Sequence, residues 1–500
     1  MILLNPQSAI CLTATFRPRL IPRRVSAALM ANSNTTLDDS TLALPVKHLI
    51  KRAPLFVDAG ISIAQAAQAM QAARVGSVLI ASEPPGIVTD RDLRGRVLAA
   101  GLGPDAVVNQ IMSRPLMTID SDTPAFAALR LMLDENIHHL PVIEEGRIIG
   151  VVSATDLLLH QGHNPLYLRG MIENWDESAR PGNYAEAIGN LVRTLFNSGL
   201  AAIHISQIVS SLNDALVKRL VALAVNRLGP APTPFAWIVF GSEGRLEQTL
   251  LTDQDNALIF QDDSGAARDY FAELARQVVE ALIKAGFPPC AGGFMATRWR
   301  KPLAAWQSLF SQWIRLPKPE ALLDAAIFFD FRAVAGNLSL ESLDEIIAAA
   351  KSQKLFLSHM ARGAMDFYPP LGFFNRLRSA NGKVDLKKSG IAPIVGLARV
   401  AALAAGSLER STLERLAVAK TSGALLSQED ATALSEIYPF FFNLRLQAQL
   451  KSLAATRAID HSVALAELST LERRHLKEAF VIIKRIQYAL VAARQLDRLG

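Results

Sequence analysis

The chain has very little cysteine. Among its 500 residues only Cys11 and Cys290 are cysteines. Two cysteines so far apart exclude a disulfide framework and give no metal-ligand spacing. Such a composition is typical of proteins in a reducing compartment, so we expect this one to be cytoplasmic.

A long apolar run is also lacking. The best stretch, residues 391–406, contains Arg399 and is shorter than the ~20 residues that a helix needs to cross a bilayer. The sequence therefore predicts no membrane span.

Basic charge is not gathered on the chain as a nucleic-acid-binding surface requires. The net charge is +6, and four arginines (Arg17, Arg19, Arg23, Arg24) lie in the first thirty residues, which contain no acid and no lysine. The rest is nearly neutral, whereas nucleic-acid recognition needs a concentrated basic patch. We expect no nucleic-acid partner.

This arginine-containing start has two interpretations. Absence of acids is typical of organellar transit peptides. Alternatively, the segment is a disordered extension, or Met30 is the true first residue. We treat residues 1–44 as a disordered extension.

The next part of the chain repeats itself. Residues 61–93 read as a helix (63–73), an apolar strand, a turn and GIVTDRDL, and residues 123–157 repeat this order with a helix (125–135) and GVVSATDL. The tandem pattern resembles a pair of CBS domains, which form a Bateman module. We place the two domains at residues 45–100 and 101–160, and we expect a homodimer through this module.

Each repeat ends with a hydroxyl residue and an aspartate, Thr89 with Asp92 and Ser153 with Asp156. Hydroxyls and free N–H groups at a helix start attract phosphate, and an aspartate one turn later can bind a ribose diol. The CBS resemblance implies an adenine nucleotide (AMP, ADP or ATP) at these positions. The alternative is that the hydroxyls cap helices and the aspartates complement the dipole.

Composition changes mark the other boundaries. Residues 161–230 read as a helical connector that ends at three prolines, and residues 231–345 as an α/β domain with strands at 237–240, 257–260 and 327–331 and a helix at 266–284. Residues 346–500 show helical periodicity without strand signals, interrupted at Asn381-Gly382 and Tyr438-Pro439. They predict an all-helical domain.

The α/β domain carries the most specific motif, GSEGRLEQTLLTDQDNALIF at residues 241–260. Gly241 and Ser242 follow an apolar strand and would approach a phosphate closely. Asp253 and Asp255 open the next strand, where residues i and i+2 share a face. Paired carboxylates suit Mg²⁺ held together with substrate phosphates. Alone, either element could instead be a turn or helix cap.

Together, strand, Gly-Ser, helix, strand and Asp-x-Asp are similar to the DNA polymerase β-like nucleotidyltransferase superfamily. The motif and the blocks RWRKPLAAWQSLFSQWI, AIFFDFRAVAG, YPPLGFF and DLKKSGIAPIVGLARVAAL resemble the DUF294 family, which is related to the uridylyltransferase domain of PII-modifying enzymes. The expected fold is therefore multidomain α+β: a CBS pair, a helical connector, a polymerase β-like α/β domain and an all-helical putative substrate-binding domain.

The resemblance implies two Mg²⁺ ions at Asp253 and Asp255 and transfer of a nucleoside monophosphate from an NTP donor to an acceptor, such as a PII-like protein. A third carboxylate normally completes such a site. Asp330 is our candidate because it is the only acid in an apolar strand; its alternative is pairing with Arg332.

Other basic residues have weaker assignments. Arg245 could contact phosphate or pair with Glu243 or Glu247, and Lys387 and Lys388 could line a phosphate surface or be solvated. The competing function is a signalling adaptor that senses nucleotides without turnover.

Overall fold

The computed structural model describes residues 42, 44–157, 165–175, 184–250, 253–457 and 459–494. Nearly all of the expected N-terminal extension lies outside these residues. The chain divides into two compact units between residues 161 and 162. Together they form a multidomain α+β protein, as expected.

The first unit contains two three-stranded sheets of the same topology. In each, the first strand pairs parallel with the second, and the second pairs antiparallel with the third. The first repeat contains β1 (Phe56–Asp58), α1 (Ile63–Ala73), β2 (Ser77–Ala81), β3 (Gly86–Thr89) and α2 (Asp90–Asp92), which a π-helix, η3 (Leu93–Leu98), continues. The second contains β4 (Ile119–Asp120), α3 (Ala125–Glu135), β5 (His139–Glu144), β6 (Arg147–Ser153) and α4 (Ala154–Leu157).

The sequence boundary between the two repeats does not coincide with their packing. Val108, Ile111 and Met112 belong to the core of the first repeat. Conversely, the short helix η2 (Val46–Leu49) at the start of the unit packs on the second repeat, where the Val46 N–H donates to the Thr123 carbonyl at 2.8 Å. Each repeat is therefore completed by the segment that precedes the other.

The second unit is built on a four-stranded sheet of order β10-β7-β8-β9. Its central strands β7 (Phe235–Val239) and β8 (Asn256–Phe260) are fully buried, which agrees with their predicted apolar runs. The edge strands are β9 (Arg300–Pro302) and β10 (Arg332–Gly336). The sheet is accompanied by α5 (Pro165–Glu173), α6 (Tyr184–Asn197), α7 (Ala202–Leu228), α9 (Gly265–Lys284), α10 (Leu303–Arg315), α11 (Pro319–Phe328) and α12 (Glu341–Ala349).

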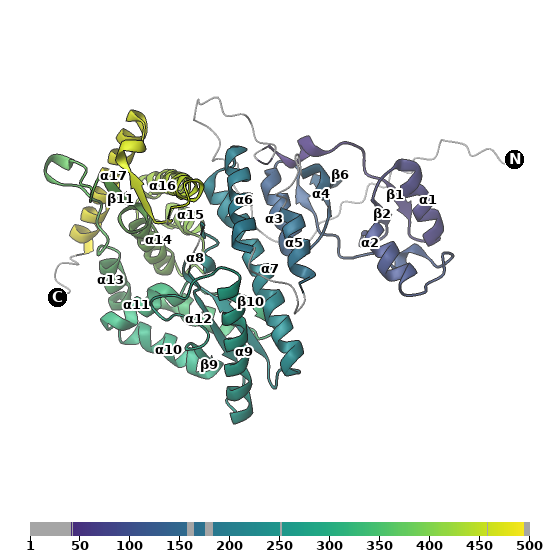
Figure 1. Cartoon of the computed structure of the whole chain (residues 1–500), viewed down its shortest axis with the longest axis horizontal. Helices are drawn as coiled ribbons and strands as arrows, with labels where there is room; N and C mark the ends of the chain where they lie inside the picture. The colour runs from purple at the N-terminus through teal and green to yellow at the C-terminus, as the bar shows by residue number, and fades with distance from the viewer. Residues whose placement is uncertain are drawn as a thin grey trace. The chain divides into compact units, whose positions relative to one another are not determined.

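Helices dominate the remainder of the second unit and gather on one side of it (Figure 1). They are α13 (Lys354–Gly363), the π-helix η8 (Lys387–Ile391), α14 (Ala392–Ala405), α15 (Thr412–Ser422), α16 (Gln428–Ala454) and α17 (Thr470–Arg494). A short antiparallel pair, β11 (Lys383–Asp385) with β12 (Ser462–Ala464), interrupts this helical region. The prediction of helices alone was therefore slightly wrong.

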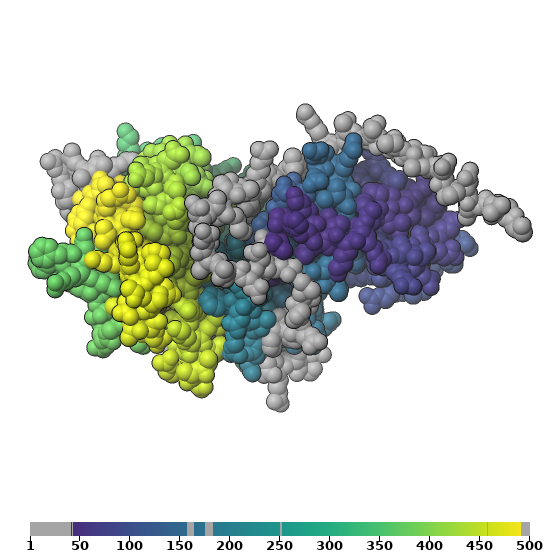
Figure 2. Space-filling model, turned by 90° about the horizontal axis from the view of Figure 1, so that it is seen from above, coloured from purple at the N-terminus to yellow at the C-terminus, as the bar shows by residue number. Residues whose placement is uncertain are grey.

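The segment between α13 and β11 projects from these helices, as the green protrusion at the left of Figures 1 and 2 shows. It exposes two aromatic side chains, since Phe373 is 84% and Phe374 94% accessible. Asn381-Gly382 forms a turn before β11, with positive φ at both residues. A turn is present at the predicted dipeptide, but it does not end a helix, because α13 already ends at Gly363.

Two element predictions were wrong. Pro439 lies inside α16 rather than ending it, because burial of neighbours such as Tyr438 and Phe441 outweighs one lost backbone hydrogen bond. The predicted strand 327–331 is instead the end of α11 and a turn, and the sheet strand begins only at Arg332. Phe328 packs against aromatic rings from other parts of the second unit, Phe240, Trp299 and Trp306.

One stretch, Lys387–Ala405, is long and apolar enough to cross a membrane by length and composition, because η8 extends α14. In the sequence analysis we predicted no stretch of this length. Two thirds (67%) of its apolar window is buried inside the protein, as in the core helix of a globular domain.

Asp330 has no exposed surface and receives three guanidinium groups. Arg245 donates to it at 2.6 Å, Arg399 binds it with two nitrogens at 3.1 and 2.6 Å, and Arg415 forms an ion pair at 2.7 Å. Although burial opposes ionisation, these cations hold the pKa of Asp330 far below its usual range. Arg399 and Arg415 come from α14 and α15, so this carboxylate joins the C-terminal helices to the sheet.

Replacement of this carboxylate should therefore destabilise the second unit. We expect Asp330→Asn to lower the free energy of unfolding by about 3–5 kcal/mol, because it leaves buried arginines uncompensated. The loss should be full above about pH 4, the usual pKa of an unfolded aspartate. Below that pH it should shrink, because the carboxylate of the unfolded wild type takes up a proton while the folded one stays ionised. Urea unfolding at several pH values measures this.

The matched control is Asp344→Asn, which removes the more exposed partner of Arg410. It should cost less than about 1 kcal/mol. Equal effects of the two substitutions would contradict a special role for Asp330.

Candidate functional site

The turn after β7 forms the first wall of the site. Gly241 has φ +59°, and a Cβ atom there would lie 2.8 Å from Oδ2 of Asp255. At Gly244 a Cβ would lie 1.9 Å from the Asp330 carbonyl oxygen. Both glycines are thus required by close approach, and the helix that they delimit, α8 (Gly241–Gly244), is only four residues long.

Ser242 lies in this turn and is half-buried. Its carbonyl accepts from the Glu247 N–H at 2.8 Å, while no described residue binds its hydroxyl. The hydroxyl is available for a ligand, as the phosphate-binding prediction requires.

Asp253 and Asp255 come together with Cys290, which follows α9. One ligand atom from each of these three residues lies within 4.8 Å of the other two. The two aspartates precede β8 instead of lying on it, but both still face this point. Burial, followed by the charge of Asp253, raises the pKa of Asp255 to about 6. Carboxylates held this close repel each other, and a divalent cation would relieve that repulsion.

The third member of this cluster is a thiol where the sequence predicted a carboxylate. Burial raises the pKa of Cys290 to about 11, so the thiol is neutral at pH 7 and hydrogen-bonds to Asp255. Mg²⁺ prefers oxygen ligands. The two aspartates fit Mg²⁺ together with substrate oxygens, and Cys290 adds a ligand suited to softer ions.

Asp330 does not join the two aspartates as a third carboxylate in this cluster, since its oxygens are bound by arginines. The alternative prediction, an ion pair between Asp330 and Arg332, is also wrong, because Arg332 binds Asp214 on α7. Arg245 bonds to Glu247 at 2.6 Å as well as to Asp330, which confirms one of its predicted pairings. The positive charge of Arg245 also acts on Asp255, where it partly offsets the rise in pKa caused by burial and by Asp253.

A third acid near the pair was missed by sequence reasoning. Glu243 is 5% exposed, and burial, followed by the charge of Asp214, raises its pKa well above the usual value. The charges of Asp255 and Asp253 act in the same direction. In the sequence Glu243 is one of several acids in a charged turn, so only its burial distinguishes it.

Of the two predicted lysines, Lys387 has a pKa on which the charges of the acid pair act. Partial burial lowers its pKa, as does the charge of Arg445, whereas Asp253 and Asp255 raise it. Lys388 is exposed, and its backbone N–H donates to Asp385 at 3.0 Å. The structure thus brings Lys387 to the pair and gives Lys388 no contact with it.

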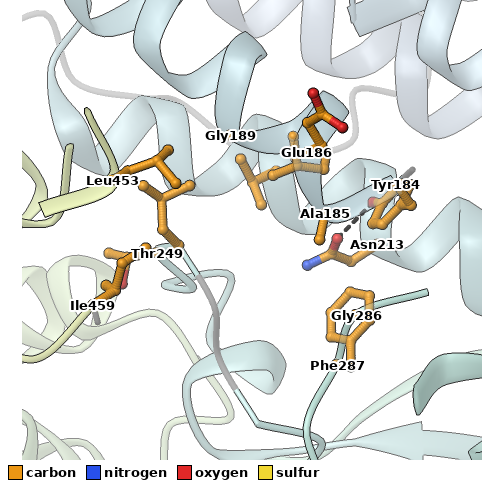
Figure 3. Close-up of a pocket in the computed structure, with 13 residues that line it drawn as sticks. Tyr184, Ala185, Glu186, Gly189, Asn213, Thr249, Gly286, Phe287, Leu453 and Ile459 are labelled. Atoms are coloured by element: carbon orange, nitrogen blue, oxygen red, sulfur yellow. Dashed lines mark hydrogen bonds between the residues drawn. The ribbon is translucent and has the colours of Figure 1, made fainter. Parts of the chain in front are cut away.

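A cavity of about 240 Å³ adjoins the segment that carries the pair (Figure 3). Its walls are mostly apolar and include Tyr184, Leu250 and Phe287. The carbonyl of Phe287, one of its lining residues, accepts from the side chain of Gln254 at 3.1 Å, and Gln254 lies between the two aspartates in sequence. None of the described residues that line the cavity carries a positive charge.

In the first unit, Thr89 and Asp92 form a capping box, and Ser153 and Asp156 repeat much of it. Asp92 accepts from the Thr89 N–H and hydroxyl at 2.9 and 2.7 Å, and Asp156 accepts from those of Ser153 at 2.8 and 2.5 Å. Asp156 also binds Lys51 at 2.6 Å. Of the two predictions for these residues, nucleotide binding or helix capping, the structure shows helix capping.

The fold and the paired aspartates define a nucleotidyltransferase-like protein with a CBS pair, and comparison with known families agrees. The model "Putative nucleotidyltransferase DUF294" matches residues 186–320, and "Putative nucleotidyltransferase substrate binding domain" matches residues 354–493. The CBS domain model matches residues 46–99 and 108–162. The chain therefore belongs to the DUF294 family and also carries a pair of CBS domains.

The curated proteins that are similar to this chain match it over only part of their length. The CBS domain-containing protein CBSCBSPB2 of Arabidopsis thaliana is 36% identical over 138 residues, 25% of this chain and 26% of that protein. Uncharacterized protein MK0525 of Methanopyrus kandleri is 40% identical over 89 residues, 17% of this chain and 45% of that protein. The chain thus spans less than half of either relative.

Among solved structures, the CBS domain protein PAE2072 of Pyrobaculum aerophilum, complexed with AMP, is 26% identical, with a TM-score of 0.22. The match covers 24% of this chain and 93% of that one.

The mixed donor set predicts how the site discriminates between metal ions. Asp253→Asn/Asp255→Asn should abolish binding of both Mn²⁺ and Cd²⁺, because the charge that attracts them is removed. Cys290→Ser should weaken Cd²⁺ binding at least about tenfold and leave Mn²⁺ nearly unchanged, because only the softer ion gains from sulfur. Calorimetric titration of the full chain measures both, and an equal loss for the two ions in Cys290→Ser would contradict the assignment.

Proposed function

We propose that the protein transfers a nucleoside monophosphate from an NTP to an acceptor. The observation that carries this proposal is the convergence of Asp253 and Asp255 beside the Gly241-Ser242 turn. Phosphoryl-type transfer depends mainly on positioning and charge neutralisation, and this arrangement offers both. Family membership supports the reaction class.

The residues have distinct roles in this proposal. Asp253 and Asp255 would hold two Mg²⁺ ions, which neutralise the triphosphate and stabilise both oxygens of an in-line displacement. The Ser242 hydroxyl and the close backbone at Gly241 would orient the phosphates. An acceptor hydroxyl then forms a bond to the α-phosphorus as the bond to the β-phosphate oxygen breaks. Pyrophosphate leaves, and the hydroxyl proton passes to water.

We further propose a protein acceptor, such as a PII-like regulator, on the family resemblance alone. The near absence of cysteine supports action in the cytoplasm, and the CBS resemblance supports a homodimer.

Label transfer tests the catalytic proposal. The full chain is incubated with Mg²⁺, each labelled NTP in turn and cell lysate. We expect transfer from one NTP, and a loss of at least about 100-fold in Asp253→Ala/Asp255→Ala, because metal-dependent charge neutralisation is removed. Exposed Asp263→Ala, which leaves the pair intact, is the matched control. No transfer by the wild type, or equal transfer by the double variant, would refute the proposed transferase activity.

A second candidate function is a non-catalytic adaptor that binds nucleotides without turnover. One observation favours it: the cluster at Asp253 and Asp255 has a neutral thiol where the expected third carboxylate would stand. Retained NTP binding with no transfer to any acceptor would select the adaptor.

We propose that the CBS pair binds an adenine nucleotide that regulates this activity. Support comes from the shared Thr/Ser–Asp geometry of the two repeats and from Lys51, which could pass from Asp156 to a phosphate.

Calorimetry of the full chain with AMP and ATP measures this binding. Asp156→Ala should weaken it about tenfold or more, since a ribose contact to a charged group is lost, and Asp92→Ala should do the same if both repeats bind. Exposed Asp122→Ala is the control. Binding that neither substitution changes would remove these contacts.

A further inference from the structure

A second polar cluster lies in the C-terminal helical region, outside the residues discussed above except for Lys387. It consists of Arg445 and Gln449 on α16, His461 before β12, and Lys387 at the start of η8; we call it the Arg445 cluster. Arg445 and Gln449 are one helical turn apart and so share a face. Both η8 and β12 pack on α16, and the Leu386 N–H donates to the His461 carbonyl at 3.0 Å.

Buried atoms of this cluster are unsatisfied. Arg445 is 4% exposed and Gln449 1% exposed. The Arg445 Nε and both polar atoms of the Gln449 amide have no hydrogen-bond partner within the described part of the chain. A buried polar group without a partner costs about 1–3 kcal/mol. Three such atoms on one helix face indicate that an external ligand completes the site.

The charges of the cluster have one dominant sign. Arg445 Nη2 lies 3.1 Å from His461 Nδ1 and, as a permanent donor, makes that nitrogen the acceptor. Neutral His461 therefore carries its proton on Nε2. Burial and the charge of Arg445 lower the pKa of His461 to about 4. Burial also lowers the pKa of Arg445, and the carboxylate acting on it is the half-buried Asp385.

Lys387 lies within electrostatic range of both the cluster and the acid pair. This lysine is exposed at the rim, and the charges of both Arg445 and the two aspartates act on it. Because Lys387 is exposed and Arg445 is buried, Lys387 marks the side from which an anion would enter.

We propose that the Arg445 cluster is an oxyanion site that binds a phosphate group of the substrate opposite Asp253 and Asp255. Arg445 Nε, the Gln449 amide N–H, the His461 Nε2–H and the Lys387 ammonium supply donors from three different elements, which suits an anion with several oxygens. Charge-assisted hydrogen bonds of this kind are the strong ones. That the phosphate belongs to the transferase substrate rests on the proposed function; the site itself does not.

Pyrophosphate is the probe, used with the full chain in EDTA so that no metal contributes. We expect calorimetry to detect binding by the wild type, weakened at least about tenfold in Arg445→Gln, because a charged donor is lost. Lys451→Gln, on the same helix but paired with exposed Glu467, is the charge-matched control and should bind normally. No binding by the wild type, or equal binding by Arg445→Gln, would overturn the proposal.

Gln449→Leu separates a binding role from a structural one. It removes two unsatisfied buried atoms, so the ligand-free variant should unfold at a higher temperature than the wild type while it binds pyrophosphate more weakly. Loss of stability together with unchanged binding would show that Gln449 only packs.

Competition between ligands shows which substrate, donor or acceptor, carries the phosphate group that the cluster binds. Displacement of pyrophosphate by NTP assigns the cluster to the donor, whereas simultaneous binding of NTP and inorganic phosphate assigns it to a phosphorylated acceptor. The Asp253→Ala/Asp255→Ala variant should retain pyrophosphate binding in EDTA. Failure of the transferase and failure of the oxyanion site are therefore distinguishable.

Discussion

The second unit depends on one buried carboxylate, Asp330, held by three arginines. A buried ion cluster is favourable only when its charges are closely compensated. Here the compensation requires α14 and α15 to approach the end of α11, since Arg399 and Arg415 come from those helices. Arg245 extends the network to the turn after β7. The position of the C-terminal helices and the shape of the Gly241-Ser242 turn are therefore coupled.

This coupling explains how residues nearly two hundred positions apart can serve one site. The sheet supplies Asp253 and Asp255 before β8, whereas the C-terminal helices supply Lys387 and, behind it, Arg445. Acids on one side and cations on the other suit a metal-bound polyphosphate, whose own charge must be neutralised along its length. The family description of the C-terminal region as a substrate binding domain agrees with this division.

How much of the structure could be predicted differs between elements. The helices Ile63–Ala73 and Ala125–Glu135 have the predicted bounds, because amphipathic periodicity is a local property. The prediction of a strand at 327–331 was wrong because a run of four apolar or aromatic residues and one aspartate fits a strand and a helix end equally well. Pro439 was wrong because packing of its neighbours overrides a local preference.

The sequence alone determined the repeat, the order of elements and the Gly-Ser and Asp-x-Asp motif, since each rests on residues close together in the chain. Only the tertiary structure decided which charges meet. Asp330 was an acid in an apolar run, and its arginines lie 69 and 85 positions away on either side, so its pairing could not be predicted. Cys290, Glu243 and Arg445 likewise gained their significance from burial and from partners distant in sequence. Electrostatic energy depends on distance in space and on desolvation, and a linear sequence specifies neither.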